Sequence, residues 1–324
     1  VKSLNTLSKC VVVTSKQYSF LVKEALDKAE IEADILLEPI GRNTTASIYL
    51  AAAFANKDDT LLIMPSDHLI KNNKKFLEVV LKASKSDIYE NWITFGILPT
   101  YPSDAYGYIK VKDSNNKSKS NEIYDVDIFI EKPSIKDASK MLKQGNIFWN
   151  AGIFMGKATM IMKSISNEAY NIASFCDEAF KTHYVVHNNE INFNLETFEK
   201  IPSKSIDFAV MEHSKNIKLI EFNAQWSDVG SWDSLVQEQD EIEAKKNIIE
   251  ISGKNNFFFA ENRIIATIGV ENLIIVDSDN ATLISKKGKT EQVKEIVENL
   301  SQLKLKMGTE HTFEKRPWGK FENI

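Results

Sequence analysis

The feature that most constrains the fold is an alternation of short apolar segments with amphipathic ones in the first hundred residues. The apolar segments are rich in β-branched residues and lack polar alternation, as expected of strands buried on both faces. They lie at residues 10–14, 33–39, 60–67 and 91–97, and predicted helices separate them at 16–29, 44–56 and 74–84. This order predicts an α/β fold, a three-layer sandwich with a mixed, mainly parallel sheet and helices on both faces.

The central part of the chain continues this pattern. A polar stretch of low complexity at residues 112–122 is predicted to be a solvent loop between two paired strands, YGYIKVK and EIYDVDIFIEKP. Further helices are predicted at 134–144, 157–166 and 169–182.

The sequence changes character at about residue 247. Short strand-like segments broken by Asn, Gly, Asp and Ser follow one another, and an amphipathic helix is predicted at about 289–304. This pattern predicts a second, smaller all-β domain. No repeat is exact, although the regular spacing of the strands suits a solenoid. The predicted domain bounds are 1–245 for the α/β domain and 246–305 for the β domain with its helix.

Composition narrows the class of protein. Hydrophobic residues make up 43% of the chain and charged residues 26%, which is typical of a globular protein. The net charge of -5 without a long basic run disfavours nucleic acid as a partner. Cys10 and Cys176 are far apart in the sequence, which disfavours a disulfide framework or a zinc site and favours a reducing cytoplasm. No apolar run approaches the roughly 18 residues of a membrane helix, so no membrane partner is expected.

In open α/β sheets ligands bind beyond the carboxyl ends of the strands, and several unusual clusters fall at such ends. The first is EPIGRNTTAS at 38–47, where Asn43 or Thr44 is expected to cap the following helix. The amides of that helix start, with Arg42, suit an anionic or hydrogen-bonding ligand. For this motif alone, a simple capped loop is the better interpretation.

A second cluster centres on two aspartates. Asp67 follows an apolar segment in MPSDHLI, and Asp228 lies between two tryptophans in WSDVGSW. A carboxylate at a strand end either caps the next helix or binds a cation, and magnesium takes one or two carboxylates together with substrate phosphates. Asp67 and Asp228 would supply such a pair if the fold brings them together, which their spacing does not decide.

The remaining clusters suit sugar recognition. Gly107 in YGYIK permits close approach of the backbone to a ligand. Glu131 and Lys132 in FIEKPS point to opposite faces if they lie in a strand, so they need not pair. Glu131 then suits sugar hydroxyls and Lys132 suits a phosphate.

The string FWNAGIF places Asn150 between an aromatic residue and the small pair Ala151 and Gly152. This arrangement suits hydroxyl recognition beside an aromatic wall. The alternative is that Trp149 belongs to the core and that Asn150 is a turn residue.

These strings occur in an order that resembles a known family. The series EP-x-GRNT, PSDH, FGI with YGYI, EKP, WN-x-G-x-F, SIDFAVME and WSDVGSW is similar to that of the bacterial mannose-1-phosphate guanylyltransferases, from near residue 10 to about 290. The resemblance implies a Rossmann-like nucleotidyltransferase domain followed by a left-handed β-helix. It also implies transfer of a guanylyl group from GTP to mannose 1-phosphate with magnesium, giving GDP-mannose and pyrophosphate.

The resemblance assigns a role to each candidate residue. Metal binding and catalysis are assigned to Asp67 and Asp228, with Lys132 as a catalytic contact to the sugar phosphate. Mannose contacts are assigned to Gly107, Glu131 and Asn150, with Gly152 beside them, and the nucleotide site to Glu38, Arg42, Asn43, Thr44 and Asp67. Trp226 and Trp232 would then wall the loop that carries Asp228, and the two carboxylates are predicted to face one another closely enough to share one ion.

The chain departs from the family pattern in three places. WNAG replaces the commoner WNSG, and SDAYGYI replaces ETGYGYI. The Gly-rich signature G-G-x-G-T-R, which holds the triphosphate in the family, is expected before Val1, and turnover is expected to need it. The segment EKRPWGKFENI at 314–324 resembles the start of a cupin-type phosphomannose isomerase domain, so we expect residues 306–324 to be a linker within a longer bifunctional protein.

Two other functions stay open at this stage. One is a related sugar-1-phosphate nucleotidyltransferase with another base or sugar, against which EPIGRNT and WSDVGSW speak. The other is a catalytically inactive module that binds sugar nucleotides. The oligomeric state is also open, and a homodimer through the β-helix domain is one option.

Overall fold

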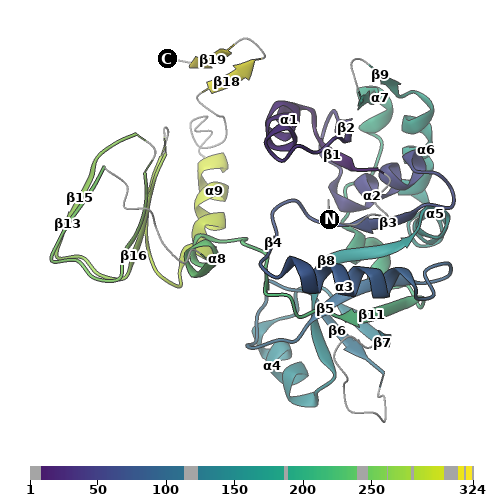
Figure 1. Cartoon of the computed structure of the whole chain (residues 1–324), viewed down its shortest axis with the longest axis horizontal. Coiled ribbons are helices and arrows are strands. Elements are labelled where there is room, and N and C mark those ends of the chain that lie inside the picture. Colours follow the sequence, from purple (N-terminus) through teal and green to yellow (C-terminus); the bar gives the residue numbers. More distant parts are fainter. Residues whose placement is uncertain are drawn as a thin grey trace. The chain divides into compact units, whose positions relative to one another are not determined.

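The computed structural model describes residues 9–112, 123–185, 189–238, 247–260, 262–278, 281–302, 313–316 and 319–322. It divides into two compact units, and Figure 1 labels most of their helices and strands. Unit 1 comprises Val1–Ser66 and Ile70–Trp226, and unit 2 comprises Asp67–Leu69 and Ser227–Ile324. The polar loop predicted at 112–122 lies, apart from Lys112, outside the described residues.

The larger sheet of unit 1 has six strands. In spatial order these are β3 (Thr60–Ile63), β8 (Ile147–Lys157), β5 (Trp92–Ile97), β11 (Ile217–Glu221), β7 (Ile123–Ile130) and β6 (Tyr108–Val111), and β6 also pairs with β8. Only β5 and β11 pair in parallel, and the other pairings in this sheet are antiparallel. The prediction of a mainly parallel sheet is therefore wrong here. The long strand β8 enters between β3 and β5, which a local pattern of strands and helices does not reveal.

The smaller sheet of unit 1 has four strands. Its order is β1 (Val11–Ser15), β2 (Asp34–Glu38), β10 (Glu190–Asn192) and β9 (Tyr184–Val185). Both β1 and β10 pair in parallel with β2, and β9 is antiparallel to β10. The strands predicted at 10–14 and 33–39 are confirmed, and helix α1 (Ser19–Lys28) connects them.

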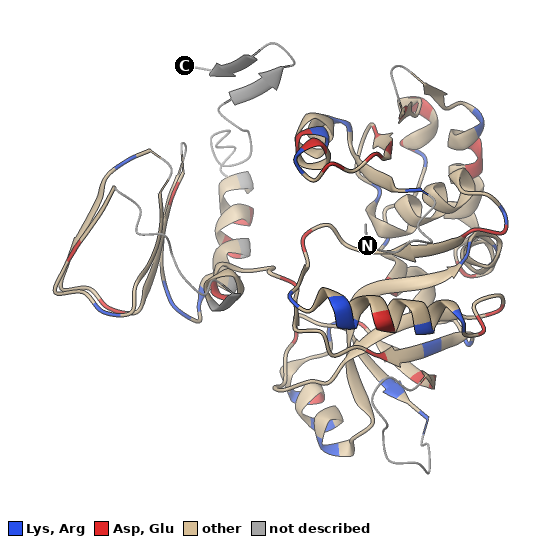
Figure 2. Ribbon diagram, viewed as in Figure 1, with Lys and Arg blue, Asp and Glu red and all other residues tan. Residues whose placement is uncertain are grey.

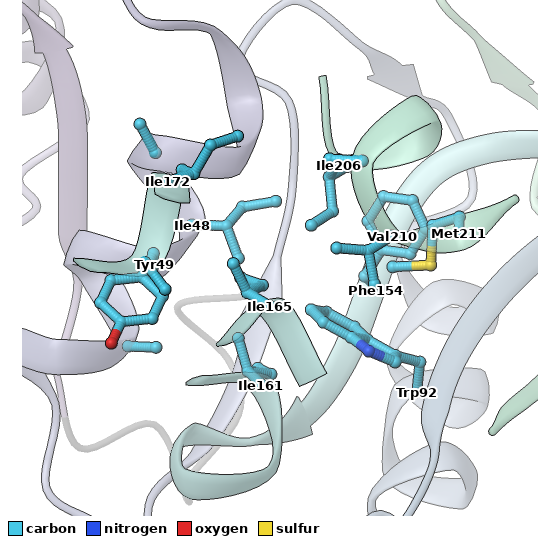
Figure 3. Close-up of a cluster of buried hydrophobic side chains, with 14 of the residues drawn as sticks. Ile48, Tyr49, Trp92, Phe154, Ile161, Ile165, Ile172, Ile206, Val210 and Met211 are labelled. Atoms are coloured by element: carbon cyan, nitrogen blue, oxygen red, sulfur yellow. The ribbon is translucent and has the colours of Figure 1, made fainter. Parts of the chain in front are cut away.

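Helices cover both faces of the six-stranded sheet. On one face, α2 (Asn43–Phe54), α5 (Ala158–Glu168) and α6 (Tyr170–Lys181) pack together over a core to which Trp92 and Phe154 contribute. Figure 3 shows this cluster, with Ile48, Ile161 and Ile165 turned toward one another.

On the other face lies α3 (Asn73–Ser84), which buries Phe76, Val79, Val80 and Ala83. Its basic and acidic positions alternate along the remaining surface (Figure 2), as in an amphipathic helix. Successive residues of the central strands alternate between the two cores: Phe154 belongs to the first core, and its neighbours Ile153 and Met155 belong to the second. The three-layer architecture is thereby confirmed.

Smaller elements complete unit 1. They are α4 (Ile135–Gln144), α7 (Leu195–Phe198), the π-helical turn Asp207–Met211, and two short strands, β4 (Leu69–Ile70) and β12 (Trp226–Ser227), which unit 1 shares with unit 2. The predicted strand at 60–67 is shorter than expected, because β3 ends at Ile63 just before Pro65, which has no N–H to offer a ladder. Asp67 therefore lies four residues beyond the strand and not at its end.

Unit 2 contains a parallel β-solenoid. Strand β13 (Ile248–Ile251) pairs in parallel with β15 (Ile265–Ile268), and β14 (Phe257–Ala260) with β16 (Leu273–Asp277). Each residue faces the one 17 positions later, as Ile248 faces Ile265 and Phe257 faces Ile274. The strands in the segment predicted to be a solenoid therefore pair in parallel from one coil to the next.

The corners of the solenoid repeat with the same spacing. Ser252 and Gly269 have φ of 53° and 65°, and Asn255 and Asn272 have φ of 55° and 57°. The Asn255 side chain donates to Asn272 Oδ1 at 2.7 Å. These left-handed positions favour Gly and Asn, which explains the turn residues that interrupt the strands in the sequence.

The solenoid is closed by elements at its end. Strand β17 (Thr282–Lys286) pairs antiparallel with β16, and α8 (Trp232–Glu238) places Trp232 against a small core of Phe257, Ile274 and Val276. Asp233 accepts hydrogen bonds from the amides of Gly288 and Thr290 at 2.7 and 3.0 Å. Helix α9 (Val293–Gln302) and the hairpin of β18 (Phe313–Arg316) and β19 (Gly319–Glu322) follow.

None of the helices among the described residues combines the length and the apolar character that crossing a membrane would require.

Candidate active site

A cradle of polar side chains surrounds Gly107, just before β6. The backbone oxygen of Gly107 accepts a hydrogen bond from the Asn150 amide at 2.8 Å. A Cβ atom on Gly107 would lie 2.5 Å from Glu131 Oε2 and 3.3 Å from the Asn150 Cβ. The space that a side chain would fill is thus bounded by two of the residues predicted to contact a sugar, and only glycine leaves it open.

The carboxamide of Asn150 is fixed by three hydrogen bonds. Its Oδ1 accepts from Thr94 Oγ1 at 3.2 Å and from the Gly152 amide at 3.1 Å, and its Nδ2 donates to Asp207 Oδ1 at 3.0 Å. The Asn150 residue is 9% exposed and lies in β8, opposite Gly96 of β5. It is therefore not a turn residue, and Gly152 contributes through its backbone.

Glu131 and Lys132 lie just past the end of β7. Lys132 has a left-handed φ of 47°, and its Nζ lies 3.1 Å from Glu131 Oε1. The expectation that these two side chains point apart is wrong, because the alternation of a strand does not extend beyond its last residue. The Glu131 side chain is 8% exposed and that of Lys132 57%, so the carboxylate belongs to the cradle, and the Lys132 side chain that pairs with it is more than half exposed.

Asp207 is part of the same cradle, although the sequence did not single it out. Burial and the negative charge of Glu131 raise the pKa of Asp207 to about 6. Glu212, at the end of the same π-helical turn, accepts a hydrogen bond from the Glu131 amide at 3.0 Å. The signal that points to Asp207 is an acid inside the apolar string SIDFAVM, where burial of an unpaired charge would be costly.

Trp149 belongs to the core and not to an open wall. It is 5% exposed, and its ring lies 4.9 Å from that of Tyr101 and 4.8 Å from that of Tyr106. Tyr106 in turn contacts Trp226 at 5.9 Å. This aromatic cluster supports the strand end that carries Asn150.

Three of the predicted nucleotide residues, Arg42, Asn43 and Thr44, lie at the start of α2 in unit 1. Thr44 Oγ1 accepts a hydrogen bond from the Ile206 amide at 2.8 Å, and Arg42 donates to the backbone oxygen of Glu199. The helix begins at Asn43, whose φ is 66°. The side chain of its N-cap residue, Arg42, makes no capping hydrogen bond to the helix. Thr44 therefore does not cap α2 but ties it to the residue that precedes Asp207.

Glu38 ends β2 and is 7% exposed. Its Oε1 accepts from Ser47 Oγ at 3.0 Å. Burial raises the pKa of Glu38, and the hydrogen bond from Ser47 opposes that rise. A buried acceptor at the end of a parallel strand, bonded to Ser47 of α2, is a suitable partner for the N–H groups of a purine ring.

Asp67 and Asp228 flank a two-stranded ribbon of β4 and β12. Within unit 2, His68 lies close enough to both carboxylates for their charges to affect its pKa. Burial lowers the pKa of His68, and the negative charges of Asp67 and Asp228 oppose that decrease only in part. His68 Nε2 lies 4.0 Å from Asp67 Oδ1, and the Asp67 side chain is 77% exposed. The carboxylate of Asp228 also lies 3.0 Å from the position of a Cβ on Gly230.

The two tryptophans of WSDVGSW have separate roles. Trp226 packs against the core of unit 1 that contains Phe76 and Phe222, whereas Trp232 packs in unit 2 with its ring 5.5 Å from that of Phe259. Each tryptophan anchors one end of the segment that carries Asp228. Among the described residues, no group of three or more His, Cys, Asp or Glu side chains is arranged to hold a metal ion.

A broad cavity of about 610 Å³ lies elsewhere in unit 1, among residues that include Tyr89, Lys163, His213 and Lys215. It contains none of the predicted site residues and lies beside the amino ends of β5 and β11. The predicted residue Asn150 instead pairs with Gly96 near the carboxyl end of β5, so the cradle and not this cavity is the candidate site.

Comparison with known proteins identifies the family. A model described as "Nucleotidyl transferase" matches residues 2–245, and a model described as "MannoseP isomerase/GMP-like beta-helix domain" matches residues 246–300. Mannose-1-phosphate guanylyltransferase 2 of Escherichia coli O157:H7 is 34% identical over 98% of this chain and 68% of its own length. Mannose-1-phosphate guanylyltransferase RfbM of Salmonella typhimurium is 34% identical over 100% of this chain and 69% of its own length.

Two solved structures share the fold. One is described as mannose-6-phosphate isomerase from Helicobacter pylori, with 28% identity, a TM-score of 0.62 and coverage of 68% of this chain and 86% of that chain. The other is described as mannose-1-phosphate geranyltransferase from Thermus thermophilus, with 23% identity, a TM-score of 0.68 and coverage of 90% and 84%. Because the curated relatives match nearly the whole length of the chain, it belongs to the mannose-1-phosphate guanylyltransferase family of nucleotidyl transferases.

Proposed function

We propose that the protein transfers the guanylyl group of GTP to mannose 1-phosphate and releases pyrophosphate. An oxygen of the sugar phosphate attacks the α-phosphorus of GTP, and the bond from that phosphorus to the oxygen of the leaving pyrophosphate breaks. The products are GDP-mannose and pyrophosphate, and no covalent intermediate with the enzyme is needed. Catalysis then depends on positioning and on neutralisation of phosphate charge.

The observation that carries this proposal is the cradle of Glu131, Asn150 and Asp207 around Gly107. Two carboxylates repel an anion, so the group bound here is the sugar and not the phosphate. A ring hydroxyl donates one hydrogen bond and accepts others, and therefore matches a carboxylate acceptor beside an amide donor. Lys132, more exposed than Glu131, is placed by this proposal against the sugar phosphate.

The choice of mannose follows from the same cradle. Mannose and glucose differ in the direction of a single ring hydroxyl. A buried polar group that one epimer satisfies and the other leaves unpaired penalises the wrong epimer. The relatives named for mannose 1-phosphate support this choice.

We assign the guanine end to the start of α2, with Glu38, Arg42, Asn43 and Thr44 around it. The hydrogen bond from the Ile206 amide to Thr44 links this region to the segment that carries Asp207. Within unit 1 the proposed nucleotide end and sugar end are thus connected through adjacent residues.

Members of the family generally use a divalent metal ion, and we propose that Asp67 and Asp228 hold magnesium. The donor set fits, because two carboxylates leave coordination positions for waters and phosphate oxygens. When bound, the ion would neutralise phosphate charge.

The test is an initial-rate assay of pyrophosphate release by the full-length protein as encoded. GTP is compared with ATP, UTP, CTP and dTTP, and mannose 1-phosphate with glucose 1-phosphate. We expect turnover with GTP and mannose 1-phosphate to exceed every other pair. Equal or faster turnover with another nucleotide or sugar would assign the chain to a different specificity, and no turnover with any pair would reject the enzymatic proposal.

A matched pair of variants connects this activity to the cradle. Glu131→Gln changes a buried acceptor beside Gly107, whereas Asp127→Asn changes a carboxylate on β7 that is 42% exposed and pairs only loosely with Lys110, at 3.7 Å. We expect the first to weaken use of mannose 1-phosphate and the second to leave the rates unchanged. A homodimer and a cytoplasmic location stay predictions, and ultracentrifugation of the purified protein tests the first.

A further inference from the structure

The hydrogen bonds of Asn150 permit only one orientation of its carboxamide. The Gly152 amide can only donate, so it requires Oδ1, and an ionised Asp207 can only accept, so it requires Nδ2. A flipped carboxamide would set two donors against each other and two acceptors against each other. Within the described residues, this arrangement uses one of the two N–H groups on Nδ2 and leaves the other for a ligand.

We propose that Asp207 is a positioning residue for the sugar, because its carboxylate holds Asn150 in the orientation that presents an N–H to a ring hydroxyl. This inference rests on the function proposed above and adds a residue to it. Without Asp207, the two contacts to Oδ1 from Thr94 and Gly152 still favour the same orientation, but the Nδ2 end has no anchor. The amide would then turn or tilt away from the ligand.

The proposed role also explains why a second carboxylate lies so close to Glu131. The two acids act differently, since Glu131 accepts from a hydroxyl and Asp207 orients the group that donates to one. Both contacts to the sugar meet above Gly107, where Glu131 Oε2 and the Asn150 Cβ bound the same space. A pair of donor and acceptor at this point matches neighbouring hydroxyls of a hexose.

The role of Asp207 depends on its charge, because a protonated carboxyl can donate as well as accept and no longer imposes one orientation. Two charged side chains just past the end of β7 act on it, Glu131 and Lys132, and Glu212 at the end of its own turn accepts from the Glu131 amide. Burial, then Glu131, raise its pKa to about 6, whereas a hydrogen bond from its own backbone amide, the charge of Lys132 and the hydrogen bond from Asn150 oppose the rise. The KM for the sugar phosphate should therefore increase as the pH falls through about 6.

The test compares the wild type with Asp207→Asn in the protein as encoded, over pH 5 to 8. Mannose 1-phosphate itself loses its second phosphate proton near pH 6, and this titration is common to both proteins. The difference between the two pH profiles therefore isolates Asp207. We expect Asp207→Asn to raise the KM for mannose 1-phosphate about tenfold at pH 7.5, to change the KM for GTP little, and to lose its part of the pH dependence.

Two further variants keep the test decisive if Asp207→Asn folds poorly. Thr94→Val removes a hydrogen bond to the other end of the Asn150 carboxamide and should raise the same KM, but without altering the pH profile. Asp207→Glu keeps a charge and should retain part of the pH dependence. Asp127→Asn serves as the control for a carboxylate lost outside the cradle.

The outcomes separate the two proposals. A wild type that neither binds mannose 1-phosphate in calorimetry nor turns it over would refute the proposed function, and this inference with it. A wild type that turns over, with Asp207→Asn keeping the same KM and the same pH profile, would refute the inference alone. A loss confined to kcat, with KM and pH profile unchanged, would likewise contradict a role in orienting Asn150.

Discussion

Replacement of Gly107 by alanine tests the cradle most directly. The added Cβ would lie 2.5 Å from Glu131 Oε2, whereas carbon and oxygen atoms in contact lie about 3.4 Å apart. The Glu131 carboxylate must therefore retreat by roughly 1 Å. A displacement of about 1 Å in a positioning group costs on the order of 100-fold in rate, and this is the expected fall in kcat/KM for mannose 1-phosphate.

The cost in stability should stay below about 3 kcal/mol. The φ of Gly107 lies outside the left-handed region, so the backbone itself accepts alanine. Overpacking costs about 1–3 kcal/mol, and the lower entropy of the unfolded chain offsets about 0.4–1 kcal/mol of it. Gly41→Ala is the matched control for stability, because a Cβ there meets no atom within 4 Å. Thermal unfolding of the two variants measures the difference.

A double-mutant cycle decides whether the effect acts through Glu131. In an assay of pyrophosphate release at saturating GTP, Glu131→Ala alone should lower kcat/KM, because the acceptor is lost. With the carboxylate removed, Gly107→Ala has nothing to displace and should cost little more. Fully additive losses, or wild-type kinetics for Gly107→Ala, would refute the reasoning from this contact.

Three other predictions follow from the remaining parts of the structure. Asp228→Asn should lower turnover by about 100-fold or more with an unchanged melting temperature, and full magnesium-dependent activity in this variant would reject its role as a metal ligand. The intact protein should prefer mannose 1-phosphate over glucose 1-phosphate by at least about tenfold in kcat/KM, and comparable values would reject the assignment of the cradle. Asp233→Ala should destabilise unit 2 by about 1–3 kcal/mol in urea unfolding, because the amides of Gly288 and of the buried Thr290 lose their acceptor. Burial raises the pKa of Asp233, but the hydrogen bonds from Gly288 and Thr290 outweigh burial, so the net pKa is lowered. The ionised Asp233 therefore stabilises unit 2 above about pH 4, and this stabilisation is lost as the pH falls further. Asp233→Ala should not show this pH dependence.

Local patterns in the sequence predicted most of the helices and the layered architecture. Amphipathic periodicity located α3 and α5 to within two residues, because the apolar residues of a helix face recur every three or four positions within one segment of the sequence. The direction of strand pairing was not predictable in this way. Strand β8 pairs with β3 and β5, which lie far earlier in the chain. The sequence of residues 147–157 does not specify which strands β8 will pair with.

The central strand β11 was missed for a related reason. Its sequence, IKLIE, alternates weakly and follows a π-helical turn, so no strong signal marks its start. Its position at the centre of the sheet depends on parallel pairing with β5, and only the fold supplies that information.

The candidate site was predictable as a set of residues but not as a network. Gly107, Glu131 and Asn150 were each identified from their strings, and the structure places them around one space. Asp207 was missed, because it lies 57 residues from Asn150 and its importance comes from a hydrogen bond between the two. The pairing of Asp67 with Asp228 in one metal site, and the domain bounds, stay predictions.

The 17-residue repeat of the solenoid limits how this part of the protein can change in length. Removing or adding a whole coil between equivalent corners, such as Ser252 and Gly269, would leave every side chain in its layer. A single residue inserted within β14 would instead reverse the inward and outward sides of the strand residues that follow it. Length variation among natural relatives of unit 2 should therefore occur in steps of one coil or be confined to the corners.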